Sequence, residues 1–205
     1  MQKYYGQQTE KAIKNFPFGT HKWQKEFILA MAQIKKAVAV ANFEAGNISR
    51  DVKNAIVRAA DEVLEGKMDN QFPLPALMGG AGTSIHMNMN EVLANRATEI
   101  LHKAGRKTVV HPNDHVNRSQ STNDVNPSAI KVAAVPLLNR LVVVLQDLGY
   151  SFEKKSMQFK NIIKLARTHL QDAVPIILGE EFAAYAYIIK RHEHEVKRVM
   201  LAALT

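Results

Sequence analysis

Three stretches of the sequence concentrate side chains that could bind and transform a small anion. In the Gly-rich run 79–84, Thr83 and Ser84 stand just before an expected helix start. Small residues let a ligand approach the backbone closely, and the free N–H groups of a helix start favour an anion. The run also fits an ordinary Gly-rich turn with a Ser/Thr cap. Its spacing matches neither a dinucleotide-binding fingerprint nor a P-loop.

The second stretch, 111–124, is dense in polar side chains. Ser121, Thr122 and Asn123 carry uncharged hydroxyl and amide donors. Such donors suit a carboxylate whose negative charge grows during a reaction. The alternative interpretation is a polar loop that caps a helix near Pro127, with Asp124 as the cap.

The third stretch, 166–175, contains Thr168 and His169 side by side. Histidine exchanges a proton near neutral pH, so His169 is the candidate for acid–base work, and Thr168 could bind a carboxylate. The alternative is a helix-terminal histidine satisfied by the backbone or by Asp172.

Two other kinds of site are disfavoured. The run 192–195 alternates His and Glu but lacks the HExxH spacing, because Val196 stands where the second His would be, so we expect a solvated surface and no metal site. No G-x-S-x-G elbow is present, which disfavours a serine hydrolase.

Composition narrows the class of protein further. The 205 residues are 46% hydrophobic and 22% charged, which is typical of a globular chain. The absence of Cys excludes a disulfide framework and fits a cytoplasmic protein. Apolar runs such as 141–145 are far shorter than the roughly 20 residues of a membrane span, so no membrane is expected. The net charge of +8 comes from scattered basic residues, which indicates solvated helix faces or attraction of a small dianion and argues against nucleic-acid binding.

Helical periodicity predicts the elements that position these stretches. Apolar spacing indicates helices over 27–41, over 49–63 with Ser49 as N-cap and Gly66 as stop, and over 88–104 with Gly105 as stop. Thr108–Val110 is the only strand candidate. We expect long helices over 127–166, with a kink or break at Pro136, and from Gly179 onward.

The expected fold class is therefore mainly α. An N-terminal helical domain, 1–126, precedes the first long helices of a bundle, 127–205. The last apolar period reaches Thr205 without a Gly or Pro stop, so the chain looks truncated. Two long helices cannot bury their apolar faces alone, which predicts partner helices from further sequence or other subunits.

Taken together, these motifs resemble the fumarase/aspartase superfamily. The resemblance covers Gly79–Val92, Ser121–Asp124, Arg167–Ala173 and the N-terminal Tyr5–Thr9. Ala81 and Thr122 stand where class II fumarases usually have Ser, and so lean toward aspartate ammonia-lyase. His86 and Glu180 depart from the commoner Asn and Gln.

The resemblance implies reversible elimination of ammonia from L-aspartate to give fumarate, with a small dicarboxylate substrate, no metal and no cofactor. The alternative is class II fumarate hydratase; a more distant one is a non-catalytic helical module that binds a polyanion. Family members are homotetramers whose active sites are assembled from three subunits.

The resemblance also implies residue roles. Ser121 and Thr122 would hold the β-carboxylate, Thr168 the α-carboxylate, and Thr83, Asn123 and the catalytic His169 would surround the amino group. A segment resembling a secondary anion site contains His111, Asn113 and Asp114. The family's Gly-Ser-Ser loop, which carries the usual catalytic base, is absent from these residues. We therefore expect the 205-residue chain to be inactive by itself.

Overall fold

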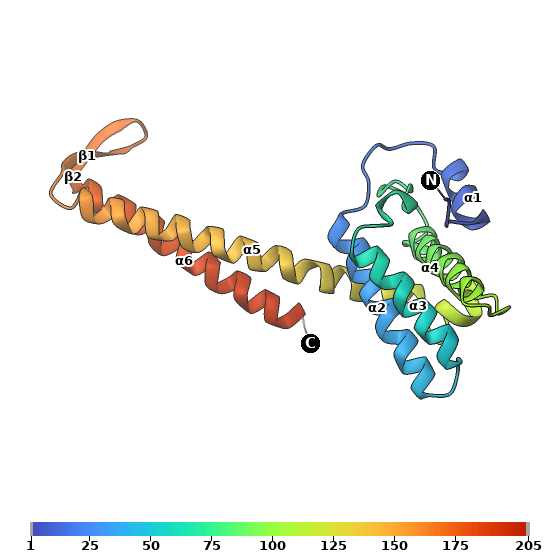
Figure 1. Ribbon diagram of the computed structural model, residues 1–205. Coiled ribbons are helices and arrows are strands. Elements are labelled where there is room, and N and C mark those ends of the chain that lie inside the picture. Colours follow the sequence, from blue (N-terminus) through green and yellow to red (C-terminus); the bar gives the residue numbers. More distant parts are fainter. Residues whose placement is uncertain (1, 204–205) are drawn as a thin grey trace. The chain divides into compact units, whose positions relative to one another are not determined.

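The computed structural model describes residues 2–203, which are mostly helical with one small sheet. The chain divides into two compact units, Met1–Ala133 and Ala134–Thr205. The first contains α1 (Gln7–Asn15), α2 (Lys25–Glu44), α3 (Arg50–Leu64), the 3-10 turn η1 (Asp69–Gln71), α4 (Thr83–Lys103), the π-helical turn η2 (Pro112–Val116) and the start of α5 (Thr122–Gln158). The second contains the rest of α5, β1 (Ile163–Thr168), β2 (Gln171–Ile177) and α6 (Leu178–Ala203) (Figure 1).

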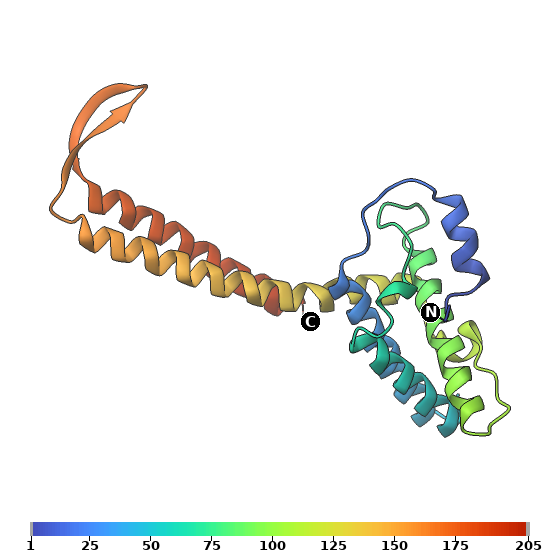
Figure 2. The ribbon, with the colours of Figure 1, turned by 45° about the horizontal axis from the view of Figure 1, so that its top comes forward.

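The core of the first unit lies where α2, α3 and α4 pack together (Figure 2). Met31, Ile56 and Met89, one from each helix, are fully buried. Their spacing places the apolar side chains of each helix on one face, so burial of that face drives the assembly of the three helices.

Three of the predicted helix boundaries are confirmed and one is wrong. Ser49 Oγ accepts the Val52 backbone N–H at 3.3 Å, and Gly66 and Gly105 follow their helices with φ of +78° and +73°. The helix expected from Asn88 instead begins at Thr83. Its N-cap, Gly82, has φ +77°, a backbone conformation that the apolar periodicity did not reveal.

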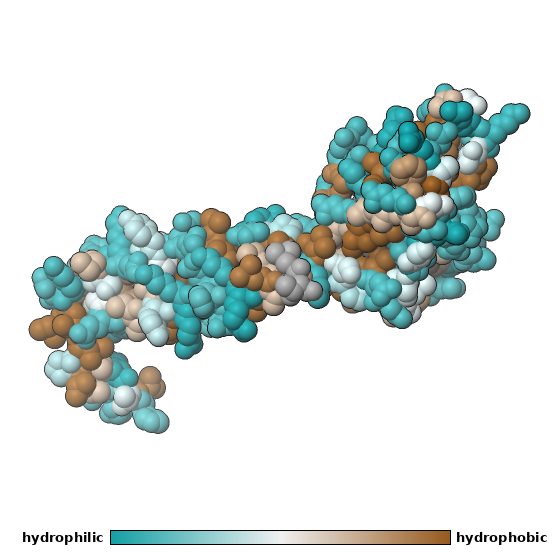
Figure 3. Space-filling model, turned by 90° about the horizontal axis from the view of Figure 1, so that it is seen from below, coloured by the Kyte–Doolittle hydropathy of each residue, from teal (hydrophilic) through white to brown (hydrophobic). Residues whose placement is uncertain are grey.

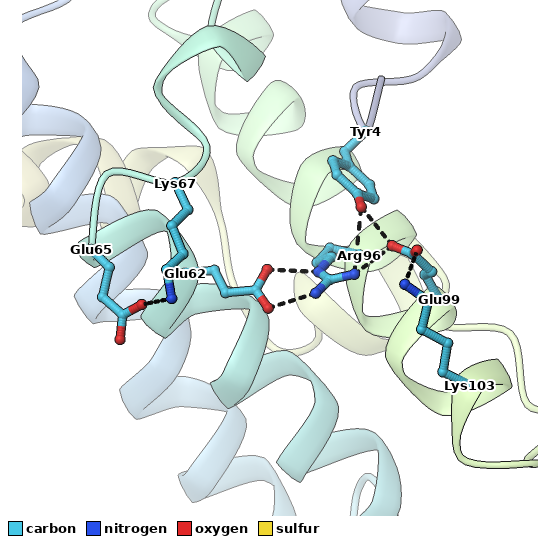
Figure 4. Close-up of polar contacts among 7 residues, drawn as sticks. All are labelled: Tyr4, Glu62, Glu65, Lys67, Arg96, Glu99 and Lys103. Carbon is cyan, nitrogen blue, oxygen red and sulfur yellow. Dashed lines mark hydrogen bonds and ion pairs between the residues drawn. The ribbon is translucent and has the colours of Figure 1, made fainter. Parts of the chain in front are cut away.

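A charged cluster ties α3 to α4 and to the N-terminal segment (Figure 4). Arg96 donates to both carboxylate oxygens of Glu62, at 2.6 and 2.7 Å, and also to Glu99. The Tyr4 hydroxyl donates to the same Glu99 carboxylate. Hydrogen bonds from Lys103 first, and then from Tyr4, lower the pKa of Glu99 to about 2, so this carboxylate is ionised across the ordinary pH range.

In the second unit, α5 and α6 run antiparallel, side by side, in both ribbon views (Figures 1 and 2). Phe152 of α5 packs against Phe182 and Tyr185 of α6, with ring centroids 6.1 and 5.7 Å apart. A Gln146–Glu193 hydrogen bond of 2.8 Å adds a polar link. The apolar faces predicted for these two helices therefore pack in part against each other.

Two predicted elements are wrong. The helix expected to reach Ala166 ends at Gln158, and an antiparallel hairpin, β1–β2, follows it. Thr108–Val110, the strand candidate, is not a strand. The β-branched residues Ile163, Val174 and Ile177 favour extended structure, and a two-residue turn joins the strands without the Asn-Gly signal that usually marks it. Of the kink or break predicted at Pro136, the break is absent, because α5 is helical from Thr122 to Gln158.

Large apolar side chains remain exposed on the second unit. They include Val143, Val144 and Leu148 of α5 and Val199 and Leu201 of α6. Figure 3 shows such hydrophobic side chains among hydrophilic ones on the surface of these helices and their hairpin. One mostly exposed stretch of α5 is long and apolar enough to cross a bilayer, judged by length and composition alone. The core helices of other proteins meet the same two criteria. The expected run of the last helix to Thr205 lies partly outside the described residues.

Candidate functional site

The first polar stretch opens α4 and lines a cavity of about 600 Å³ in the first unit. Thr83 and Ser84, in the first turn of α4, share this cavity with His111 and Asn113 of the η2 segment. Gln7, Gln8 and Lys11 of α1 form its opposite wall. We call it the α1–α4 cavity.

Glu91 of α4 holds the α1 wall in place. One of its carboxylate oxygens accepts hydrogen bonds from the backbone N–H of Gly6 at 2.9 Å and of Thr9 at 3.1 Å, and from the Thr9 hydroxyl at 2.6 Å. The other accepts the Gln8 N–H at 2.8 Å. Three of these donors are free N–H groups at the start of α1, where a carboxylate is favoured.

The predicted secondary anion segment only partly faces this cavity. His111 and Asn113 line it, whereas Asp114 does not and is largely exposed. His111 Nδ1 instead lies 3.0 Å from the Asp114 carboxylate and accepts the Asp114 backbone N–H at 3.2 Å. His111 therefore caps the η2 turn as well as lining the cavity, whereas Asp114 lies outside it.

The second polar stretch opens α5 and lines a separate cavity of about 320 Å³. Thr122 and Asn123 form part of its wall, with Gly82 behind them. We call it the α5 cavity; its other lining residues are Trp23, Phe27, Ala81, Asn126, Pro127 and Ile130. Ser121 is exposed outside this lining, and its Oγ accepts the Asn123 N–H at 3.1 Å. Ser121, not the expected Asp124, therefore caps α5.

Asn126 fixes the Gly-rich run against α5. Its Nδ2 donates to the Ala81 carbonyl at 3.2 Å. A Cβ added at Gly82 would lie only 2.0 Å from that nitrogen, and the φ of +77° disfavours any side chain there. Asn126 Oδ1 is buried and has no hydrogen-bond partner among residues 2–203. The α5 cavity thus has an unused acceptor in its wall.

A buried polar chain lies behind Thr122. Its hydroxyl is 2.7 Å from Nδ1 of His86, and Nε2 of His86 is 2.6 Å from Nζ of Lys35. Lys35 is fully buried and also donates to Asn117 Oδ1 at 2.9 Å and to Gln120 Oε1 at 2.8 Å. Burial lowers the pKa of Lys35 to about 7; burial and, next, the Lys35 charge lower the pKa of His86 to about 3.

The third polar stretch lies at the tip of the hairpin in the second unit. Thr168 pairs with Gln171 at the end of the ladder, and His169 and Leu170 form the turn with φ of +49° and +62°. All of these side chains are exposed. His169 is therefore not a helix-terminal residue, and the Arg167–Asp172 ion pair of 3.4 Å spans the hairpin beside it.

The structure thus groups the candidate residues into three places. Thr83, His111 and Asn113 share the α1–α4 cavity, Thr122 and Asn123 share the α5 cavity, and Thr168 and His169 share the hairpin tip. The run 192–195 lies on α6, where Glu193 is engaged with Lys197 and Glu195 with Arg198.

Sequence reasoning missed the buried chain behind Thr122. The one available signal was the position of Lys35, which lies four residues after Met31 and three before Val38 and so falls on the apolar face of α2. A lysine at such a position needs buried acceptors, and nothing in the sequence indicated that His86, Asn117 and Gln120 would supply them.

Comparison with known proteins places these motifs in a family. The family model described as Lyase matches residues 1–204. An aspartate ammonia-lyase of Bacillus subtilis is 48% identical over 197 residues, which are 96% of this chain and 41% of that protein. A class II fumarate hydratase of Blochmanniella floridana is 46% identical over 200 residues, 97% of this chain and 45% of that protein.

Solved structures agree with the sequence comparison. The crystal structure of class II fumarase from Schistosoma mansoni superposes with a TM-score of 0.91 at 35% identity, covering 99% of this chain and 43% of the fumarase. The chain therefore spans less than half the length of these relatives. It belongs to the lyase family that includes aspartate ammonia-lyases and class II fumarate hydratases.

Proposed function

We propose that this chain forms part of an aspartate ammonia-lyase, which eliminates ammonia reversibly from L-aspartate to give fumarate. The observation that supports it most is the α5 cavity, where the uncharged donors Thr122 and Asn123 lie beside the Gly-rich run. Ala81 and Thr122 favour aspartase over fumarase by resemblance. The relatives include both enzymes at similar identity, so class II fumarate hydratase is the second candidate.

In this reaction a base removes the Cβ proton, and the resulting carbanion spreads its charge onto the β-carboxylate. Ser121 and Thr122 donate hydrogen bonds to that carboxylate, which gains negative charge in the transition state. Asn123 and His169 surround the amino group, and Thr168 binds the α-carboxylate. Thr83, which the resemblance also assigns to the amino group, lines the α1–α4 cavity of this structure. The base comes from a segment outside these 205 residues, and the chemistry needs no metal and no cofactor.

We further propose that the working enzyme is a cytoplasmic homotetramer in which one site uses residues of different copies. The exposed apolar side chains of α5 and α6 support this, because a second copy would remove them from water. The exposed hairpin tip supports it as well, since Thr168 and His169 are free to enter a cavity of another copy. His111 and Asn113 then form a secondary anion site in the α1–α4 cavity.

The test is the ultraviolet absorbance of fumarate, produced from L-aspartate or from L-malate by the full-length enzyme. We expect L-aspartate to be the better substrate, and fumarate to be consumed only when ammonium is added. His169→Ala is expected to lower kcat/KM about a hundredfold, whereas His194→Ala, an exposed histidine of the same unit, should leave it unchanged.

Two results would contradict this proposal. Turnover of L-malate but not L-aspartate would make the enzyme a fumarase. Equal kinetics for His169→Ala and His194→Ala would remove His169 from the site.

A further inference from the structure

We propose that Lys35 and His86 are positioning residues, which hold the Thr122 hydroxyl as a hydrogen-bond donor to a substrate carboxylate. This inference rests on the function proposed above, in which Thr122 binds that carboxylate. It concerns two buried residues on α2 and α4 that do not line the α5 cavity themselves.

The donors of Lys35 are matched by the acceptors around it. A lysine ammonium has three N–H donors and no acceptor. The fully buried Nζ has three neighbours that can accept: Asn117 Oδ1 at 2.9 Å, Gln120 Oε1 at 2.8 Å and His86 Nε2 at 2.6 Å. Each donor therefore has one acceptor, and burial of the charge is compensated only when His86 accepts.

The charged Lys35 fixes the tautomer of His86. Because the ammonium can only donate, Nε2 must carry the lone pair. Burial and the adjacent Lys35 lower the pKa of His86 to about 3, so the ring is neutral at pH 6 and, while Lys35 is charged, carries its one hydrogen on Nδ1. Nδ1–H then donates to Thr122 Oγ1 at 2.7 Å.

The His86 tautomer in turn fixes the direction of the Thr122 hydroxyl. Its oxygen accepts from His86, so its own hydrogen is free to donate, and His86 is its one hydrogen-bond partner found in the described part of the chain. Thr122 lines the α5 cavity, where a ligand carboxylate would accept this hydrogen. A hydrogen-bond chain that begins at a buried cation also polarises each member and strengthens the last donor.

The chain can reverse when Lys35 loses its proton. A neutral amine still donates to Asn117 and Gln120, but it accepts from Nε2–H of His86, so that Nδ1 accepts from the Thr122 hydroxyl. Thr122 then presents only lone pairs to the cavity and repels a carboxylate. Burial lowers the pKa of Lys35 to about 7, which places this reversal near neutral pH.

Three other titratable groups on the elements packed against α2 are engaged elsewhere. Asp61 of α3 pairs with the neighbouring Lys36 at 2.6 Å, and Glu62 of α3 pairs with Arg96. His115 of η2 accepts the His111 backbone N–H at 2.8 Å. His86 is thus the titratable side chain that bonds to Lys35 among the described residues.

One experiment reads the chain directly, without activity. The full-length enzyme is labelled with ¹⁵N-histidine, and the His86 signals are assigned by their loss in His86→Asn. We expect the Nδ1–H tautomer at pH 6 and a shift toward Nε2–H as pH rises through about 7, with no shift in Lys35→Met. An Nε2–H tautomer at pH 6 would overturn the inference.

A second experiment compares His86→Asn with His86→Gln in the full-length enzyme. The Asn amide nitrogen lies near the position of Nδ1 and can donate to Thr122, whereas the Gln amide lies near Nε2 and reaches only Lys35. We expect kcat/KM of His86→Asn to exceed that of His86→Gln by about tenfold, the effect of one hydrogen bond to a charged group. Thermal melts of both variants check that each folds.

The outcomes separate this inference from the proposed function. A wild-type enzyme that turns over neither L-aspartate nor L-malate contradicts the proposed function, and with it the carboxylate that Thr122 would bind. An active enzyme in which His86→Asn and His86→Gln lose kcat/KM equally contradicts this inference alone.

Discussion

Glu91→Gln should strongly destabilise the first unit, because Glu91 is the acceptor for four hydrogen bonds that hold the start of α1 on α4. Three of these bonds end on one carboxylate oxygen and the fourth, from the Gln8 N–H, ends on the other. A glutamine has only one oxygen. Its amide nitrogen must therefore face at least one N–H donor of the N-terminal segment.

The size of the effect follows from this count. If the amide oxygen takes the position with three donors, the bond to Gln8 is lost and a donor faces a donor. One lost hydrogen bond to a charged group amounts to about 1.5–3 kcal/mol, and the remaining three weaken because the acceptor is no longer charged. We expect a loss of about 3–5 kcal/mol, which is a large share of the stability of an ordinary domain.

The measurement is denaturant unfolding followed by the fluorescence of Trp23, the single tryptophan of the chain, which stacks on Phe27 in the first unit. Glu65→Gln is the matched control, since Glu65 forms an exposed pair with Lys67 and should contribute less than about 1 kcal/mol. Faster hydrogen exchange at the Gly6 and Gln8 amides should accompany the change. Equal stabilities of the two variants would refute this account of Glu91.

Three further predictions concern pH, the site and association. Lys35 loses its proton near pH 7 in the folded protein and near 10.5 in the unfolded protein, so unfolding takes up a proton between these pH values. The free energy of unfolding should therefore rise with pH by up to about 1.4 kcal/mol per pH unit, relative to Lys35→Met. Denaturation of the wild type and of Lys35→Met from pH 7 to 10 measures the difference. In the full-length enzyme, Asn123→Ala should reduce kcat/KM about a hundredfold and Asn113→Ala much less, because Asn123 orients the reacting end of the substrate; steady-state kinetics on L-aspartate would reveal an equal or reversed order. The 205-residue chain alone should produce no fumarate yet scatter light as an oligomer or aggregate. Turnover would show that the base lies within these residues, and a stable monomer would show that the apolar faces are misassigned.

The helices of the first unit were predictable because each buries one apolar face and ends at a recognisable signal. Ser49 and Gly66 bound α3 as the sequence indicates, since an N-cap hydroxyl and a left-handed glycine act locally. The start of α4 was not predictable in the same way. It depends on Gly82 packing against Asn126, a contact between residues far apart in the sequence.

The hairpin shows a different limit. Its strands pair with each other over a turn of His169 and Leu170, and Leu170 is a residue type that rarely adopts positive φ. Local sequence therefore argued against a turn, and pairing of the apolar strands decided the structure. The same turn exposes His169, which the motif identified as a candidate without indicating its surroundings.

The polar residues of the candidate site could be identified from the sequence by their type, whereas the buried residues that hydrogen-bond to them could not. Thr122 and Asn123 stand out as donors in a short polar run, whereas Lys35 and His86 are distributed over two helices. A buried network is visible only after the helices are packed, because its hydrogen bonds join elements distant in sequence.

The proposed site combines the hairpin tip of one copy with the α5 cavity of another, and mixing of inactive variants tests this most directly. His169→Ala and Asn123→Ala full-length enzymes, each impaired alone, are co-expressed in equal amounts and assayed for fumarate production. If the two residues come from different copies, random assembly leaves about a quarter of the sites with both native side chains, and that share of wild-type activity should return. Activity no higher than that of either variant alone, in confirmed mixed oligomers, would contradict a site shared between copies.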